Sequence, residues 1–270
     1  GRPSFNPLIA HVSDIAAARR LAEFDAAAER LAKAFWPGPL TLVLRRAPAV
    51  DLAITGGQDT VAVRVPAHPV AQQLLRAFGG GVAAPSANRY GHVSPTRPDH
   101  VRDEFGGSVK VILDGGDCKI GLESTIVSCV DTVPRILRPG SLTLTQLRTV
   151  VPELQAGPDN GAPRVPGSDA NIRACPATAA TRVATRPPRV ANKYMTWINA
   201  GRRADVYGRE LYVNLRTLDK SGAKEILVEE VPAGEAWDAV RDRLHRAASA
   251  ENVVYGDPDI AALRADLGQD

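Results

Sequence analysis

Short apolar runs alternate with helical segments through the first 150 residues, and this alternation constrains the fold more than any other feature of the sequence. The runs typical of strands lie at 8–12, 40–45, 61–65, 81–84, 109–113, 124–130 and 134–137. The segments typical of helices lie at 14–35, 70–78, 97–105 and 143–150, with Ser13 as the expected cap of the first. Strands that interleave with helices in this way predict an α/β domain.

The alternation stops in a segment rich in proline and glycine and then resumes. Residues 156–190 carry no helical or strand periodicity, which predicts a linker. A helix at 204–218, a strand at 225–231 and a helix at 235–250 follow. We therefore expect one domain over 1–155, a linker over 156–190 and a small α/β domain over 191–270.

Composition excludes several classes of protein. With 44% hydrophobic and 23% charged residues the chain is typical of a globular protein, and no apolar run approaches the roughly 18 residues of a membrane span. A formal net charge of +3 is too small to indicate a nucleic-acid binder by itself. The chain does not open on a secretory signal, and its three cysteines have no zinc or redox spacing. We expect a cytoplasmic protein without a membrane partner.

Polar residues at strand ends are the candidates for chemistry, because the common phosphate-loop, dinucleotide, zinc-protease and nucleophile-elbow motifs are absent from the sequence. Arg64 and Thr60 share one face of an apolar strand, and burying that arginine favours an anionic partner; a solvent-facing edge is the alternative. His11 ends an apolar run, where a core histidine is the alternative. Arg2 lies in a proline-stiffened segment that suits recognition of phosphate or carboxylate, unless it is merely solvated.

Two further segments carry polar groups. Ser86 and Asn88 lie in a tight bend after a strand, where small polar residues suit a phosphate or ribose, although turn chemistry also explains them. Ser124 and Thr125 begin an apolar strand, and Arg138 ends the next one.

These segments, in this order, resemble the threonylcarbamoyl-AMP synthase family over residues 1 to about 155. The matching motifs are Gly1-Arg2-Pro3-x-x-x-Pro7-Leu8, Arg64-Val65-Pro66, Pro85-Ser86-Ala87-Asn88, Ser94-Pro95-Thr96, Glu123-Ser124-Thr125-Ile126-Val127 and Arg138-Pro139-Gly140. Residues 209–219 and 242–248 are similar to the C-terminal domain of the family's two-domain branch. The resemblance implies a YrdC-like domain, a twisted open mixed sheet with helices, followed by a small Rossmann-like α/β domain.

The resemblance also implies an activity. It is the synthesis of threonylcarbamoyl-AMP and pyrophosphate from L-threonine, bicarbonate and ATP, with Mg²⁺ accompanying ATP. The product feeds the N6-threonylcarbamoyl modification of adenosine 37 in tRNA, so the tRNA threonylcarbamoyl-transferase machinery is the implied partner, together with weak RNA binding. Because the reaction can proceed by positioning the substrates, no covalent nucleophile and no protein metal ligand are assigned.

The resemblance assigns roles to individual residues. The residues implied to bind ATP are Arg2, Asn6, Thr60, Ser86, Ser94 and Arg138. Those implied to bind L-threonine are His11, Arg64, Ala84 and Ser124, with Asn88 and Thr125 as further candidates.

Three departures separate the chain from the family pattern. The family has a first strand and loop and a lysine before Gly1-Arg2-Pro3, and we expect weak activity from a chain that lacks them. Arg89-Tyr90-Gly91 replaces a Ser-Gly segment. Residues 170–176 replace a His-Tyr-Ala-Pro-like segment, which a one-nucleotide change of reading frame would largely restore, as resequencing would test.

Two alternatives remain open. One is a shortened, catalytically weak relative that binds nucleotide or RNA. The other is carbamoyl transfer of the hydrogenase-maturation type, against which the appended domain argues. Release of pyrophosphate from ATP only when threonine and bicarbonate are both present would separate them.

Overall fold

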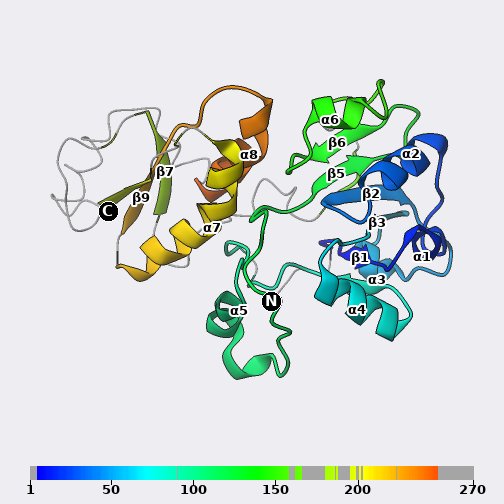
Figure 1. Cartoon of the computed structure of the whole chain (residues 1–270), viewed down its shortest axis with the longest axis horizontal. Coiled ribbons are helices and arrows are strands. Elements are labelled where there is room, and N and C mark those ends of the chain that lie inside the picture. The colour runs from blue at the N-terminus through cyan, green and yellow to red at the C-terminus, as the bar shows by residue number, and fades with distance from the viewer. Residues whose placement is uncertain are drawn as a thin grey trace. The chain divides into compact units, whose positions relative to one another are not determined.

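A six-stranded mixed sheet organises the first part of the chain in this computed structural model (Figure 1). The structure describes residues 5–89, 91–157, 162–165, 180–185, 187, 195–198, 201, 203–222 and 224–248. The chain divides into two units, each described here by itself. The first unit comprises 1–86, 113–115 and 123–169, and the second comprises 87–112, 116–122 and 170–270.

The sheet of the first unit has the strand order β4-β1-β3-β2-β5-β6. Its strands are β1 (Ile9–His11), β2 (Leu40–Arg45), β3 (Thr60–Arg64), β4 (Val82–Ala84), β5 (Thr125–Ser128) and β6 (Arg135–Arg138). β1 pairs in parallel with β3, and β2 with β5, whereas the other neighbours are antiparallel. The predicted α/β class with an open mixed sheet is therefore confirmed.

The predicted single helix over 14–35 is wrong, because two helices occupy this region. They are α1 (Ile15–Arg19) and α2 (Ala26–Phe35). The backbone between them bonds to the end of β2 and the residues after it instead of continuing a helix: Glu23 N donates to Arg45 O at 2.9 Å, and Ala47 N donates to Leu21 O at 2.8 Å. Asp25 then caps α2 by accepting a bond from Ala28 N at 2.7 Å.

Two smaller expectations also fail. Asp14, not Ser13, caps α1, because its carboxylate accepts the bond from Ala17 N at 2.7 Å. Residues 109–113 form no strand, and two of their apolar side chains face solvent, with 74% of Val111 and 55% of Leu113 exposed. An apolar pattern becomes a strand only where a neighbouring strand can bond to it.

Three further helices lie close to their predicted positions: α4 (Pro69–Phe78), α5 (Pro98–Phe105) and α6 (Leu144–Arg148). The short helix α3 (Leu52–Thr55) was not predicted. No helix in the described part of the chain is long and apolar enough to cross a membrane.

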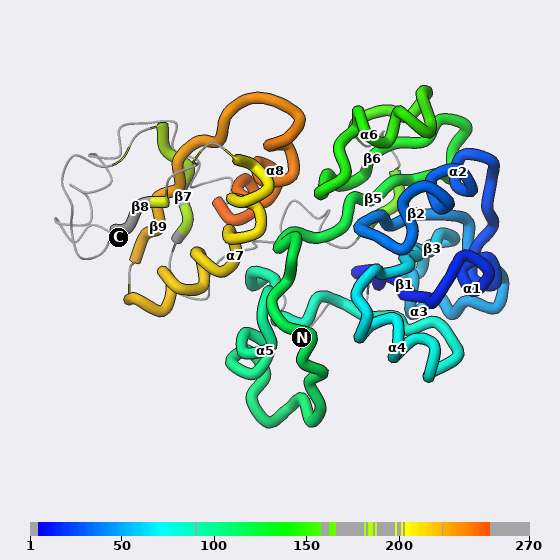
Figure 2. The backbone as a smooth tube through the Cα atoms, viewed as in Figure 1, coloured from blue at the N-terminus to red at the C-terminus, as the bar shows by residue number. Residues whose placement is uncertain are grey.

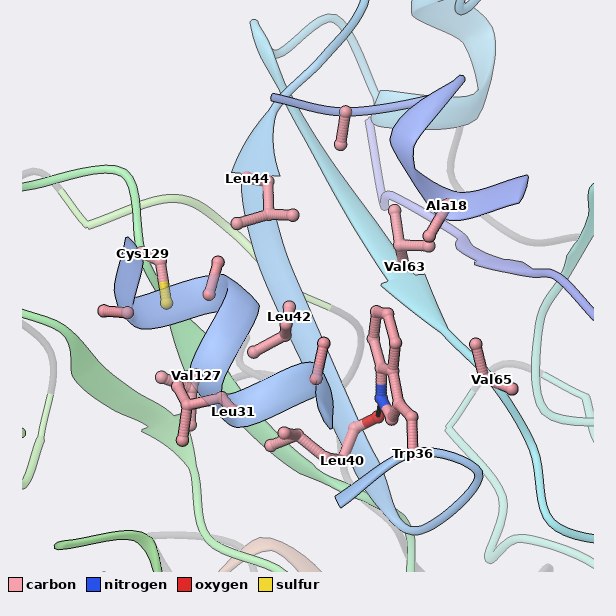
Figure 3. Close-up of a cluster of buried hydrophobic side chains, with 14 of the residues drawn as sticks. Ala18, Leu31, Trp36, Leu40, Leu42, Leu44, Val63, Val65, Val127 and Cys129 are labelled. Atoms are coloured by element: carbon pink, nitrogen blue, oxygen red, sulfur yellow. Dashed lines mark hydrogen bonds between the residues drawn. The ribbon is translucent and has the colours of Figure 1, made fainter. Parts of the chain in front are cut away.

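One face of the six-stranded sheet forms the main core with α1, α2 and α6. The alternate residues Leu40, Leu42 and Leu44 of β2 point to this face, where Leu31 of α2 lies over them (Figure 3). The indole of Trp36 packs in the same cluster, and its Nε1 donates to Leu40 O at 2.7 Å. This face therefore supplies most of the apolar burial of the unit.

The opposite face carries a smaller apolar cluster. Val43, Ala62, Ile126 and Leu137 pack there against Val165, from the segment 162–165. Gln58 and Arg164 hold this segment by reciprocal bonds: Gln58 Nε2 donates to Arg164 O at 3.0 Å, and Arg164 N donates to Gln58 Oε1 at 2.7 Å. The rest of this face is left to polar side chains.

The second unit contains a three-stranded parallel sheet in the order β7-β9-β8. Its elements are β7 (Ala180–Ala184), β8 (Met195–Ile198), α7 (Ala204–Lys220), β9 (Glu225–Glu229) and α8 (Asp238–Ala247). A 3₁₀ turn, Glu235–Trp237, occupies the start of the predicted helix over 235–250. The small C-terminal α/β sheet is confirmed.

The residues between β4 and β5 belong largely to the second unit, and they include helix α5, which can be followed along the chain in Figure 2. Glu104 of α5 accepts a bond from Arg216 of α7 at 3.2 Å and pairs with His92 at 2.6 Å. The carboxylate of Glu104 is nearly buried, so burial raises its pKa, while the backbone bond from Arg89 and the charges of His92 and Arg216 lower it, and the net shift is downward.

The turn that follows β6 contains Gly140 and packs against the first residue of β5. A Cβ at Gly140 would lie 2.3 Å from Thr125 N and 2.7 Å from Thr125 Oγ1. Thr125 Oγ1 in turn donates to Leu142 O at 2.9 Å and accepts from Leu142 N at 3.0 Å. Position 140, in the turn Arg138-Pro139-Gly140, therefore accommodates only glycine.

We expect Gly140→Ala to destabilise the first unit by about 2 kcal/mol or more, because the new methyl group meets backbone atoms that cannot rotate away. Urea unfolding measures the effect. Gly107→Ala is the matched control, since a Cβ there meets nothing within 4 Å, and it should change stability by no more than about 1 kcal/mol. Equal stability of the two variants would contradict this account.

Candidate functional site

Alternate residues of the central strands face away from the main core. Val61 and Val63 of β3 point into that core, so Thr60, Ala62 and Arg64 point to the opposite face. The same alternation turns His11 of β1 and Thr41 of β2 to the opposite face. Polar side chains from several strands are thereby collected on one side of the sheet.

Five of these side chains follow one another across the strands, and we call them the polar row. His11 lies opposite Arg64 in the pairing of β1 with β3. Leu42 lies opposite Val63 in the pairing of β2 with β3, which puts the next residues, Thr41 and Arg64, on neighbouring strands. Ser124 bonds to Thr41 and to Arg138. The polar row consists of His11, Arg64, Thr41, Ser124 and Arg138.

A backbone carbonyl holds the Arg64 side chain against the face of the sheet. Its Nε donates to Gly38 O at 3.1 Å, and burial lowers the pKa of the guanidinium below its usual value. Gly38 must be glycine, because a Cβ there would lie 2.2 Å from Phe35 O. Within the part of the chain that the structure describes, no carboxylate pairs with Arg64. A partly buried guanidinium of this kind is suited to bind an anionic ligand.

His11 is uncharged at neutral pH. Burial, and then the positive charge of Arg64, lower its pKa from 6.5 to about 4. A neutral imidazole offers one donor and one acceptor beside the guanidinium.

Arg138, Ser124 and Thr41 form a buried cluster at the other end of the polar row. Arg138 Nη2 donates to Ser124 O at 2.9 Å and to Ser124 Oγ at 3.3 Å. Ser124 Oγ and Thr41 Oγ1 are 2.7 Å apart. The sequence predicted Ser124 and Arg138 but not Thr41, whose only signal is a hydroxyl in the apolar strand Leu40–Arg45.

Three predicted residues gather at the edge of the sheet where β1 and β3 begin and β4 ends. Ile9 lies opposite Ala62 on one side and Ala84 on the other, so Asn6, Thr60 and Ser86 lie near the same edge. Thr60 and Arg64 are four residues apart on β3, a distance of about 13 Å. Both point to the same face, so the edge and the polar row lie on one face of the sheet.

Asn6 is the unusual member of this edge. Its side chain is 4% exposed, and neither its amide nitrogen nor its amide oxygen has a hydrogen-bond partner in the described structure. The adjacent backbone is fixed, because Leu8 N donates to Ile54 O at 2.9 Å and Gly56 leaves room for Phe5 O, which a Cβ would meet at 2.4 Å. A buried amide without partners is a position where a ligand can supply the missing bonds.

The remaining predicted residues have local contacts of their own, belong to the second unit or lie outside the described residues. Ser94 and Asn88 belong to the second unit, where Asn88 Nδ2 donates to Arg89 O at 2.8 Å and His92 O at 2.9 Å and thereby holds a turn. Thr125 bonds to the Leu142 backbone. Arg2, Tyr90 and the segment 170–176 lie outside the described residues.

Among the described residues, no three histidine, cysteine, aspartate or glutamate side chains are grouped so that they could hold a metal ion.

Comparison with known proteins places this geometry in a family. A family model described as telomere recombination matches residues 1–140, and one described as the C-terminal domain of threonylcarbamoyl-AMP synthase matches residues 173–249. The threonylcarbamoyl-AMP synthase of Pyrococcus abyssi is 37% identical, over 92% of this chain and 81% of that protein. The synthase of Bacillus subtilis is 38% identical, over 89% of this chain and 71% of that protein.

A solved structure is similar over both units. The crystal structure of Pyrococcus abyssi Sua5 complexed with L-threonine has a TM-score of 0.85 and 35% identity, and the match covers 94% of this chain and 83% of that one. The chain thus belongs to the threonylcarbamoyl-AMP synthase family, a family of nucleotidyltransferases.

Proposed function

We propose that the chain forms threonylcarbamoyl-AMP and pyrophosphate from L-threonine, bicarbonate and ATP at the polar row and the adjoining sheet edge. The observation that carries this proposal is the partly buried guanidinium of Arg64, which has no carboxylate partner among the described residues. The similar structure of Pyrococcus abyssi Sua5 contains L-threonine, whose carboxylate matches the geometry of an arginine fork.

The reaction needs two bond-forming steps. The amino nitrogen of threonine first attacks the carbon of bicarbonate, and loss of water leaves a carbamate. A carbamate oxygen then attacks the α-phosphorus of ATP, and the bond to pyrophosphate breaks. Neither step needs a covalent nucleophile of the protein, so the contribution of the site is to hold the reactants in line.

The amino acid belongs on the polar row. Arg64 would bind its carboxylate, and neutral His11, Ser124 and the backbone at Ala84 would bind its remaining polar groups. The nucleotide belongs at the neighbouring edge, with Asn6, Thr60 and Ser86 and with Arg138 behind Ser124. Arg2 and Ser94 complete the nucleotide set that family resemblance implies.

Mg²⁺ would enter as the counter-ion of the ATP phosphates, whose charge it neutralises. The product would serve the N6-threonylcarbamoyl modification of adenosine 37 in tRNA, through the tRNA threonylcarbamoyl-transferase machinery in the cytoplasm. The alternative is a relative that binds nucleotide or RNA without catalysis, and it predicts that no pyrophosphate is released from ATP.

Pyrophosphate release tests the proposed function. The protein should release pyrophosphate from ATP only when L-threonine and bicarbonate are both present, with threonylcarbamoyl-AMP as the co-product in mass spectrometry. Binding of ATP without pyrophosphate release under any combination would instead support the binding-protein alternative.

Arg64→Ala should weaken L-threonine binding on the order of 30-fold or more, because loss of a charged contact commonly costs about 2 kcal/mol or more. The affinity for ATP should change little. Calorimetric titration of each ligand measures both affinities. Arg76→Ala is the matched control, since it removes one exposed positive charge from α4. An equal loss for both ligands would count against a carboxylate clamp at Arg64.

Asn6→Leu should lower ATP affinity while leaving the melting temperature unchanged or raising it. The buried amide has no partners to lose, so its replacement by an apolar side chain removes two unsatisfied polar atoms. Differential scanning fluorimetry with and without ATP measures both effects. A lowered melting temperature with unchanged ATP affinity would make Asn6 a structural residue.

Acidification should destabilise the first unit through His11. Because its pKa is about 4 in the folded state against 6.5 ordinarily, the unfolded state binds more protons between these pH values. Stability is therefore lost as the pH falls from about 6.5 to about 4, by on the order of 3 kcal/mol. Urea unfolding of the parent and of His11→Gln should show curves that diverge over this range, whereas parallel curves would refute the burial of a neutral His11.

A further inference from the structure

The hydroxyls of Thr41 and Ser124 are hydrogen-bonded to each other, and one of them must be the donor. Their oxygens are 2.7 Å apart, and Arg138 Nη2 also donates to Ser124 Oγ, at 3.3 Å. Thr41, Ser124 and Arg138 each bring a donor proton, but only two hydrogen bonds to a hydroxyl oxygen are made in the cluster. One hydroxyl proton therefore has no acceptor inside the cluster.

Burial decides which proton is left. Thr41 is 0% exposed, and among the described residues the oxygen of Ser124 is the one acceptor within bonding distance of its hydroxyl. A buried hydroxyl proton with no acceptor has lost its hydrogen bond to water and gained none in return, which is unfavourable. Thr41 therefore donates to Ser124, not the reverse.

This direction fixes the role of Ser124. A hydroxyl oxygen has two acceptor positions, and those of Ser124 are taken by Thr41 and Arg138. Its own proton must then point to an acceptor outside the cluster. Ser124 lies on the sheet face that carries Arg64, so this proton is available to a ligand bound on the polar row.

We propose that Thr41 is a positioning residue, which makes Ser124 a hydrogen-bond donor to an oxygen of the bound amino acid. The inference rests on the proposed function and deepens it. It assigns a role to a residue that never contacts the ligand, and it specifies the ligand group as an acceptor oxygen, such as that of a carboxylate or carbamate. Without Thr41, Ser124 can rotate and present a lone pair, which repels such an oxygen.

Steady-state kinetics of pyrophosphate release test this role. Thr41→Val and Thr41→Ala both remove the hydroxyl and differ in volume, whereas Thr41→Ser keeps the hydroxyl. We expect both hydroxyl-free variants to raise KM for L-threonine about 10-fold, with KM for ATP changed less than about twofold, since one hydrogen bond is worth about 1.4 kcal/mol. Thr41→Ser should behave like the parent.

A double-mutant cycle with Ser124→Ala separates positioning from packing. In the Ser124→Ala background, Thr41→Val should have no further effect on KM for L-threonine, because the hydroxyl through which it acts is absent. Ser128→Ala is the matched control, since it removes another buried hydroxyl of β5 and should leave both KM values unchanged.

Three results would overturn the inference: additive effects in the cycle, equal increases in both KM values, or an effect of Thr41→Ala much larger than that of Thr41→Val, which a packing role produces. A parent protein that neither binds nor uses L-threonine would refute the proposed function, and the inference with it. A parent that uses L-threonine, together with a Thr41→Val variant like it, would refute the inference alone.

Discussion

A partly buried positive charge with no acidic partner among the described residues is the constraint on which the first unit depends. Arg64 lies inside a sheet face, and its bond to Gly38 O holds it there. That carbonyl is placed by a turn that tolerates no side chain at Gly38. The turn at Gly38, which follows α2, and the strand β3, which bears Arg64, therefore act together. They hold a desolvated guanidinium in a position where it can bind an anion.

The two faces of the sheet have different roles: one stabilises the fold, and the other carries the polar side chains of the candidate site. One face buries the leucines of β2 under α2 and supplies the apolar burial. The other face can then carry hydroxyls, an imidazole and two arginines, because its apolar cluster is small and is partly covered by the segment 162–165. Polar side chains on strands are costly unless each has a partner, and in the cluster at Ser124 every polar group finds one except a single hydroxyl proton, which is left for a ligand.

The sequence predicted most strands of the first unit, because buried strands such as Leu40–Arg45 read as apolar runs. It did not predict the break between α1 and α2, since the helical periodicity continues through residues whose backbone bonds to the end of β2 and beyond it. Site residues at strand ends were identifiable as polar groups in apolar surroundings. Thr41 was not, because its role depends on the partner across the sheet, and sequence spacing does not reveal hydrogen-bond direction.

A crystal structure of this protein with L-threonine tests most directly whether the amino acid binds on the polar row. The threonine carboxylate should lie within hydrogen-bonding distance of the Arg64 guanidinium, with a threonine oxygen within reach of Ser124 Oγ. Threonine bound away from the polar row, with Arg64 contacting no part of it, would contradict the account.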